Sequence, residues 1–172
     1  MRFLTSLTAK TILCLNSWIY STKSSVRTSS QNSFPSEQAT YYAPVRIYRG
    51  LLAEHPKDPL LLNNLAWALG QLKDPTAVEY AETANSLAPD NPAILDTLGW
   101  ILVENGKDAR GVELLTKASN LAPGAHAVRL HLAQALLKSG QKDAGRKQLE
   151  VLAGMSEESA IKQEAKKLLS SL

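Results

Sequence analysis

Apolar residues recur every three or four positions along most of the chain from about residue 41 onward, the spacing that places them on one face of an α-helix. Leu95, Leu98 and Leu102 form one such stripe, and Leu115 with Ala118 form a stripe that would face it. The pattern predicts a succession of helices that bury their apolar faces against one another. The predicted ranges are 44–54, 59–70, 75–87, 92–105, 108–121, 125–139, 142–154 and 157–171.

Residues that start and stop helices lie between these ranges. Asp58, Asp74 and Asn91 each precede a proline, and an Asx side chain can accept hydrogen bonds from the N–H groups of a first turn that begins with proline. Gly106 and Gly140 stand where a helix must stop and the chain must turn back, a place that favours positive φ. The chain is therefore predicted to consist of helix–turn–helix units.

These units repeat with a period of about 34 residues. Leu-Ala-Pro at 87–89 returns at 121–123, and the block Leu-Ala-Trp at 65–67 aligns with Leu-Gly-Trp at 98–100 and Leu-Ala-Gln at 132–134. Glycine inside a helix costs about 1 kcal/mol relative to alanine, so Gly99 and Gly111 predict a close approach of two helices. A fixed period of two helices indicates a stacked array.

The markers resemble those of the tetratricopeptide repeat (TPR). With Pro92 as the first residue of a repeat, the matching positions are Leu95, Leu98, Gly99, Leu102, Leu115, Ala118 and Pro123, and Gly111 replaces the usual alanine. The repeat that begins at Pro59 is one residue short at its turn, and the repeat that begins at His126 lacks its terminal proline. The resemblance implies an all-α, right-handed superhelix of antiparallel helix pairs, with about three repeats, a leading half-repeat at 44–54 and a C-terminal end helix. Four polar residues on that helix would cover the end of the array, namely Lys162, Glu164, Lys166 and Lys167.

A narrower resemblance lies in the blocks Leu-Asn-Asn-Leu-Ala-Trp at 62–67 and Asp-Thr-Leu-Gly-Trp at 96–100. They resemble the C-terminal region of the long TPR lipoproteins of bacterial PEP-CTERM/exosortase protein-sorting systems. That resemblance implies a setting in protein sorting, export or envelope polysaccharide-linked assembly. Cys14, the single cysteine, follows Thr-Ile-Leu and so has no lipoprotein processing site.

Residues 1–40 differ in composition from residues 41–172, and we predict a boundary between a disordered or targeting-like segment and a TPR domain there. The first segment has 15 Ser or Thr residues and four basic residues against one acidic residue. The uncharged stretch 11–22 is too short to cross a bilayer but has the length of a signal-peptide apolar region. A signal, an organelle transit segment and a misassigned start all fit. A signal would place the protein in the cell envelope or periplasm, and otherwise it would be cytoplasmic; any membrane association would come from this segment.

Charge and motif content argue against several functions. Residues 41–172 contain 15 basic and 15 acidic side chains, so they offer no overall attraction for nucleic acid. His55, His126 and His131 lack metal-ligand spacing, and no glycine-rich phosphate loop is present. We expect no enzyme activity, no metal and no cofactor.

The candidate binding surface lies on the first helix of each repeat, which lines the concave side of such an array. Trp67 and Trp100 occupy equivalent positions there, and they could be anchors of a peptide groove or core residues between adjacent first helices. The basic pair with which some TPR domains clamp a C-terminal carboxylate is missing, so that ligand is not predicted. The candidates are Asn63, Asn64, Trp67, Gln71, Asp96, Thr97, Trp100, Glu104, His131, Gln134 and Lys138.

The predicted function is a protein–protein interaction scaffold that binds a partner peptide or protein in the groove. Two alternatives stay open: a stacking segment of a larger TPR solenoid with binding elsewhere, and an RNA-binding helical repeat. The sequence does not predict the oligomeric state.

Overall fold

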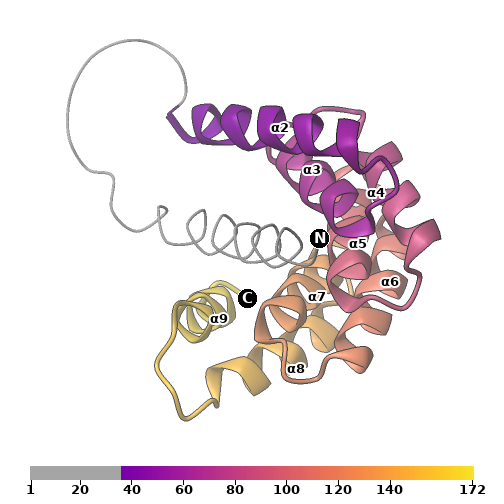
Figure 1. Cartoon of the computed structure of the whole chain (residues 1–172). Coiled ribbons are helices and arrows are strands. Elements are labelled where there is room, and N and C mark those ends of the chain that lie inside the picture. Colours follow the sequence, from indigo (N-terminus) through magenta and orange to yellow (C-terminus); the bar gives the residue numbers. More distant parts are fainter. Residues whose placement is uncertain (1–35) are drawn as a thin grey trace. The chain divides into compact units, whose positions relative to one another are not determined.

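The computed structural model describes residues 36–172, with side chains from residue 40 onward, and this part of the chain is helical without strands (Figure 1). Residues 35–172 belong to one compact unit. The predicted targeting segment falls largely outside the described residues. The helices are α2 Ser36–Glu54, α3 Pro59–Gln71, α4 Ala77–Leu87, α5 Pro92–Glu104, α6 Asp108–Leu121, α7 His126–Lys138, α8 Lys142–Ala153 and α9 Ala160–Ser170.

Helices α3 to α9 lie where the apolar spacing predicts them, with small differences at their ends. The exception is α2, which begins at Ser36 and not at residue 44, and which contains Pro44 in its interior. Proline removes a helical hydrogen bond, but it does not end this helix. Tyr41, Val45 and Tyr48 are buried along one face of α2, and their burial offsets the lost bond.

Side-chain caps fix the starts of the first helices. The Asp58 Oδ1 atom accepts hydrogen bonds from the N–H groups of Leu60 and Leu61, at 2.8 and 3.1 Å. Asn91 accepts in the same way at the start of α5. Asp74 differs, because its carboxylate accepts from Thr76 and closes a turn ahead of α4. The capping prediction is thus confirmed for Asp58 and Asn91, whereas Asp74 lies two residues ahead of Thr76, the N-cap of α4.

The turn within each helix pair has a residue with positive φ. Gly106 and Gly140 have φ of 74° and 80°, and Lys73 takes the same place after α3 with φ of 56°. The N–H group of the next residue donates back to a carbonyl five positions earlier in all three turns, for example from Asp74 to Leu69 at 3.0 Å. The repeat that is one residue short therefore keeps the turn geometry, with a lysine in the glycine position.

The helices form two layers. Helices α3, α5, α7 and α9 each contact the next member of that series, whereas α4, α6 and α8 contact only helices adjacent to them in the chain. Because the first layer is packed more closely along the array, the stack curves toward it, and α3, α5 and α7 line the inner side. The described part of the chain is an all-α solenoid of helix pairs, as predicted.

The core lies between the layers and continues from pair to pair. Leu98, Leu102 and Leu115 are fully buried between α5 and α6. The next interface is joined through Leu115, which packs in one cluster with Leu132 of α7. At the other end, α9 buries Ala165 against α8 and exposes polar residues, as predicted for an end helix. Of the four polar residues predicted there, Lys166 and Lys167 are exposed, whereas Lys162 and Glu164 are partly buried.

Candidate functional site

The structure brings the predicted binding residues onto the inner helices α3, α5 and α7, but not all of them are accessible. Asn63, Asn64 and Thr97 each expose only 7% of their surface. The Thr97 hydroxyl donates to the carbonyl of Ala93 within its own helix, at 3.1 Å. These three residues lie between neighbouring helices, and the remaining candidates form the accessible surface.

Side chains of α5 and α7 meet in a polar and aromatic group, which we call the α5–α7 cluster: Asp96, Trp100, Glu104, His131 and Lys138. The Nδ1 atom of His131 lies 2.9 Å from both carboxylate oxygens of Asp96. The His131 ring stacks on the Trp100 indole, with centroids 5.1 Å apart and planes inclined by 28°. The Nζ atom of Lys138 lies 5.2 Å from the Trp100 ring centroid and also pairs with Glu104.

The spacing of the helices explains why these residues meet. Asp96, Trp100 and Glu104 are four positions apart on α5 and share a face, and His131 and Lys138 are two turns apart on α7. Each residue contacts a partner about one repeat period away, so the cluster joins the second repeat to the third. Gln134 lies between them on α7 and is half-buried.

Trp67 occupies the corresponding place on α3 but has a different neighbour. Its indole meets the Tyr41 ring of α2 edge to face, with centroids 5.4 Å apart and planes inclined by 74°. Sequence reasoning missed Tyr41, because that residue lies ahead of the helix predicted at 44–54. Both indoles are half-buried, so each is partly accessible from the inner side and partly packed between helices.

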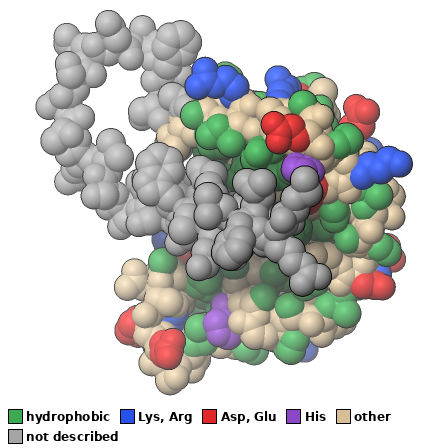
Figure 2. All heavy atoms as spheres, in the orientation of Figure 1, with side chains coloured by type: hydrophobic (Ala, Val, Ile, Leu, Met, Phe, Trp, Pro, Cys, Tyr) green, Lys and Arg blue, Asp and Glu red, His purple; other side chains and the backbone are tan. Residues whose placement is uncertain are grey.

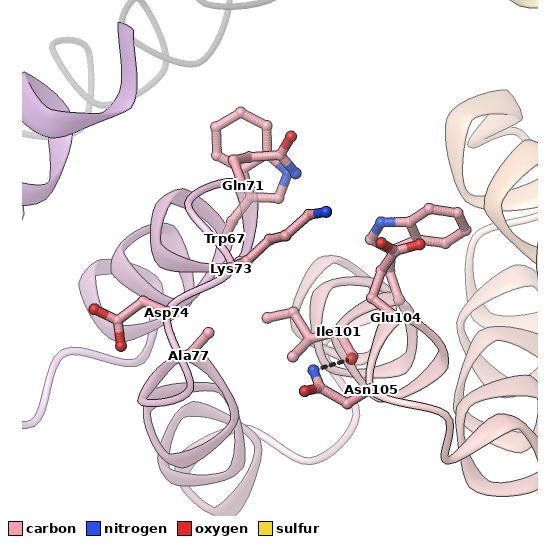
Figure 3. Close-up of a pocket in the computed structure, with 10 residues that line it drawn as sticks. Trp67, Gln71, Lys73, Asp74, Ala77, Ile101, Glu104 and Asn105 are labelled. Carbon is pink, nitrogen blue, oxygen red and sulfur yellow. Dashed lines mark hydrogen bonds between the residues drawn. The ribbon is translucent and has the colours of Figure 1, made fainter. Parts of the chain in front are cut away.

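A pocket of about 510 Å³ opens between α3, α4 and α5 (Figure 3). Four of the residues that line it are among the groove candidates from the sequence: Trp67, Gln71, Trp100 and Glu104. The lining residues of the turns after α3 and α5 are not among those candidates. One signal could have found the first of these turns, namely a lysine where the next two repeats have glycine. The residues that line the pocket are Trp67, Gly70, Gln71, Lys73, Asp74, Ala77, Trp100, Ile101, Glu104 and Asn105.

The charged side chains around this pocket differ in whether they form hydrogen bonds or ion pairs with other residues. Hydrogen bonds from Thr76 hold the pKa of Asp74 below its usual value, so its carboxylate is engaged in the turn. Glu104 is paired with Lys138 of the α5–α7 cluster. Lys73 is exposed and forms no ion pair with any of the described residues. Figure 3 shows its side chain extending toward Glu104, while Asp74 points the other way.

The remaining described surface offers little for other chemistry. Figure 2 shows charged side chains of both signs scattered at the edges of the visible face, without one large patch of either sign. Within residues 36–172, His, Cys, Asp and Glu side chains form no group of three that could hold a metal ion. Across the same range, no helix combines the length and the apolar character needed to cross a bilayer.

Comparisons with known proteins agree with the repeat assignment. The sequence matches no model of a known protein family. It is 35% identical over 88 residues to a TPR repeat-containing protein of Pseudomonas aeruginosa, and the match covers 50% of this chain but only 15% of that protein.

Among solved structures, a mutant of MamA superimposes with a TM-score of 0.59 at 22% identity, over 77% of this chain and 78% of the other. At that identity the similarity concerns the fold alone. Together with the two-layer packing and the turn geometry, these similarities show that the chain is a TPR-like protein with an all-α TPR-type solenoid fold.

Proposed function

We propose that this protein is a non-enzymatic scaffold that binds an extended segment of a partner protein on the inner face of α3, α5 and α7. The observation that carries the proposal is the pair Trp67 and Trp100. They stand at equivalent places in successive repeats, are half-buried and line one pocket. Partly accessible indoles in a recess are the usual anchors of protein interfaces, because they bury a large apolar area with little loss of side-chain entropy.

The α5–α7 cluster supports the same proposal by keeping this face in one shape. A hydrogen bond between Asp96 and His131, an ion pair, a stacked ring and a cation over an indole link the side chains of two repeats. A surface that is already ordered loses less entropy when a partner binds. The cluster also presents side chains that can donate and accept hydrogen bonds beside a pocket lined by two indoles, the combination of polar and apolar groups that ligand sites use.

The test is affinity capture from a cell extract with the full chain, comparing the wild type with Trp67→Ala/Trp100→Ala. The matched control is Leu87→Ala/Leu121→Ala, which removes two large apolar side chains that are exposed on second helices one period apart. We expect a partner recovered by the wild type and the control to be lost by the tryptophan variant. Equal recovery by a folded tryptophan variant would remove the indoles from the binding surface.

For the cellular setting, we propose bacterial protein sorting or export, or envelope polysaccharide-linked assembly. This rests on the blocks at 62–67 and 96–100 that resemble PEP-CTERM/exosortase-system TPR lipoproteins. Fractionation of cells and N-terminal sequencing of the mature protein test it, and recovery of the intact chain only from the cytoplasm of a bacterium would contradict it.

A second function is favoured by one observation. The segment of this chain that matches the Pseudomonas aeruginosa relative covers only 15% of that protein. In a longer protein, such a segment would extend the solenoid while other parts of the protein bind the partner. A full chain that is folded and monomeric, and that recovers no partner specifically, would support this function over the scaffold.

A further inference from the structure

The lining of the pocket between α3, α4 and α5 is half polar and half apolar, and its apolar walls come from a few side chains. The indoles of Trp67 and Trp100 line it together with Ile101 and Ala77. Gly70 contributes no side chain. A Cβ atom there would lie 3.2 Å from Ile101 Cγ1, closer than an ordinary van der Waals contact. These walls suit a flat or extended apolar stem of a guest side chain.

The charged side chains at the mouth of the pocket differ in whether they can still pair with a guest. The Asp74 carboxylate accepts from Thr76 N and Thr76 Oγ1 at 2.9 and 2.6 Å, and its side chain points away from the pocket (Figure 3). Glu104 is neutralised by Lys138. Neither Asp74 nor Lys73 has an ion-pair partner among the described residues, but Asp74 is hydrogen-bonded and points away, whereas Lys73 extends toward Glu104 (Figure 3). A guest therefore meets one available charge, and that charge is positive.

The backbone of Lys73 adds an independent observation. Its φ of 56° lies in the left-handed region, and the equivalent turns of the next two repeats have Gly106 and Gly140 there. A side chain costs roughly 1–2 kcal/mol in that conformation. Uncommon backbone conformations of this kind concentrate at functional sites. In this turn the strained residue is a lysine, whose side chain places an ammonium group at the mouth of the pocket.

We propose that this pocket binds a carboxylate of the partner that is carried on an apolar or aromatic stem. The stem lies against Trp67 and Trp100, and Lys73 Nζ is the counter-ion of the carboxylate. The inference rests on the proposed function, since the partner's segment must cross α3 and α5 to deliver this group. An acidic side chain and the C-terminus of the partner both offer the required chemistry.

Small probes test the chemistry of the pocket without a partner. The full chain is labelled with ¹⁵N, and the indole N–H resonances of Trp67 and Trp100 are followed during titration at low salt. The probes are 3-phenylpropanoate, 3-phenylpropanamide and 3-phenylpropylamine, which share a stem and differ in charge. Lys73→Gln removes the cation, and Lys107→Gln is the matched control, because Lys107 follows the equivalent turn and lies outside the pocket.

We expect both indole resonances to shift with all probes that bind, and the carboxylate to bind roughly two- to fivefold more tightly than the amide, the range of one exposed charge pair. The amine should bind most weakly. Lys73→Gln should abolish the difference between carboxylate and amide, and Lys107→Gln should keep it. Equal affinities in the wild type, tightest binding of the amine, or a preference that survives Lys73→Gln would each overturn the proposal.

Two blocked peptides then distinguish the sources of the carboxylate. One has an internal Phe-Glu and an amidated C-terminus, and the other ends in Phe with its terminal carboxylate and has no acidic side chain. Tighter binding of the first assigns the pocket to an acidic side chain, and tighter binding of the second assigns it to a chain terminus. If neither shows a Lys73-dependent preference, the proposal fails.

Failure here is distinct from failure of the scaffold function. Probes that bind without regard to charge would remove the carboxylate preference and leave the inner face as the binding surface. Partner recovery that is indifferent to Trp67→Ala/Trp100→Ala would remove the inner face as the binding surface, whatever the probes show.

Discussion

A Cβ atom added to Gly111 would lie 2.7 Å from the carbonyl oxygen of Gly99, so these two glycines let α5 and α6 approach at backbone distance. The same atom would also collide with Val103 Cγ2, and a Cβ on Gly99 would meet Leu115 Cγ at 2.8 Å. The close approach predicted from the two glycines is confirmed. The first repeat has Ala66 and Ala77 at the corresponding places, so its helix pair needs no such contact between glycines.

Gly111→Ala should therefore destabilise the protein even though alanine is the usual residue at this place in the repeat. Overpacking a buried contact costs about 1–3 kcal/mol, and the better helix propensity of alanine recovers about 1 kcal/mol. We expect a net loss of up to about 2 kcal/mol in the free energy of unfolding, measured by urea denaturation.

Gly50→Ala is the matched control, because Gly50 lies inside α2 with nothing within 4 Å of its added Cβ. That substitution should stabilise the chain by about 0.5–1 kcal/mol. If Gly111→Ala stabilises the protein as Gly50→Ala does, the α5–α6 distance is not set by the glycines.

In the turn after α3, a substitution to glycine is expected to stabilise the protein. Lys73→Gly replaces a side chain in the left-handed region and should raise the free energy of unfolding by about 1 kcal/mol. Gly106→Lys places a lysine at the equivalent turn, where φ is 74°, and should lower it by a similar amount. A Lys73→Gly variant that is less stable than the wild type would show that the lysine side chain has a stabilising contact that outweighs its backbone cost.

Asp74 should show a pH-dependent contribution whose sign follows from its hydrogen bonds. The side-chain hydroxyl of Thr76, then its N–H group, hold the pKa of Asp74 below its ordinary value. A carboxyl with a lowered folded-state pKa stabilises the fold above its unfolded pKa of about 3.9, and this contribution is lost as the pH falls through the lower folded value.

Thr76→Ala removes the hydroxyl donor and leaves the backbone N–H donor. The pKa of Asp74, followed by the ¹³C shift of its carboxyl carbon, should rise in the variant and remain below the ordinary value. Thr116→Ala is the control, because the Thr116 hydroxyl donates to the Val112 carbonyl and does not touch Asp74. An unchanged pKa in Thr76→Ala would mean that the backbone N–H alone is responsible.

The sequence was sufficient to predict the helix pairs, because apolar spacing, Asx caps and a fixed period all depend on local chemistry. It was less informative about accessibility. A first helix in a solenoid packs against its own pair and against two neighbouring repeats, so residues next to the apolar stripe become buried as well. Asn63, Asn64 and Thr97 are examples, since each was predicted for the surface of the groove and each exposes 7%.

Contacts between repeats were the other part that sequence could not supply. That Trp100 stacks on His131 and Trp67 meets Tyr41 depends on the rotation of each first helix about its axis, and tertiary packing sets that rotation. The pocket was missed for a similar reason. Lys73 lies in a turn, outside any periodic pattern. It lines a pocket only because α5 packs beside that turn in the folded protein.

The two polar pairs of the α5–α7 cluster should differ in strength, because they differ in exposure. The side chains of His131 and Asp96 expose 24% and 16% of their surface, whereas those of Lys138 and Glu104 expose 47% and 43%. Water and salt screen the second pair more strongly. Double-mutant cycles with alanine at each position measure the coupling energy from urea denaturation.

We expect a coupling energy of about 1.5–3 kcal/mol for Asp96 with His131, in the range of a hydrogen bond to a charged group. For Glu104 with Lys138 we expect about 0.2–1 kcal/mol, which should fall further in 1 M salt. If the cluster holds the inner face in one shape, the first pair must carry most of that effect, because the second is too exposed to do so. Equal couplings, or a larger one for Glu104 with Lys138, would contradict this order.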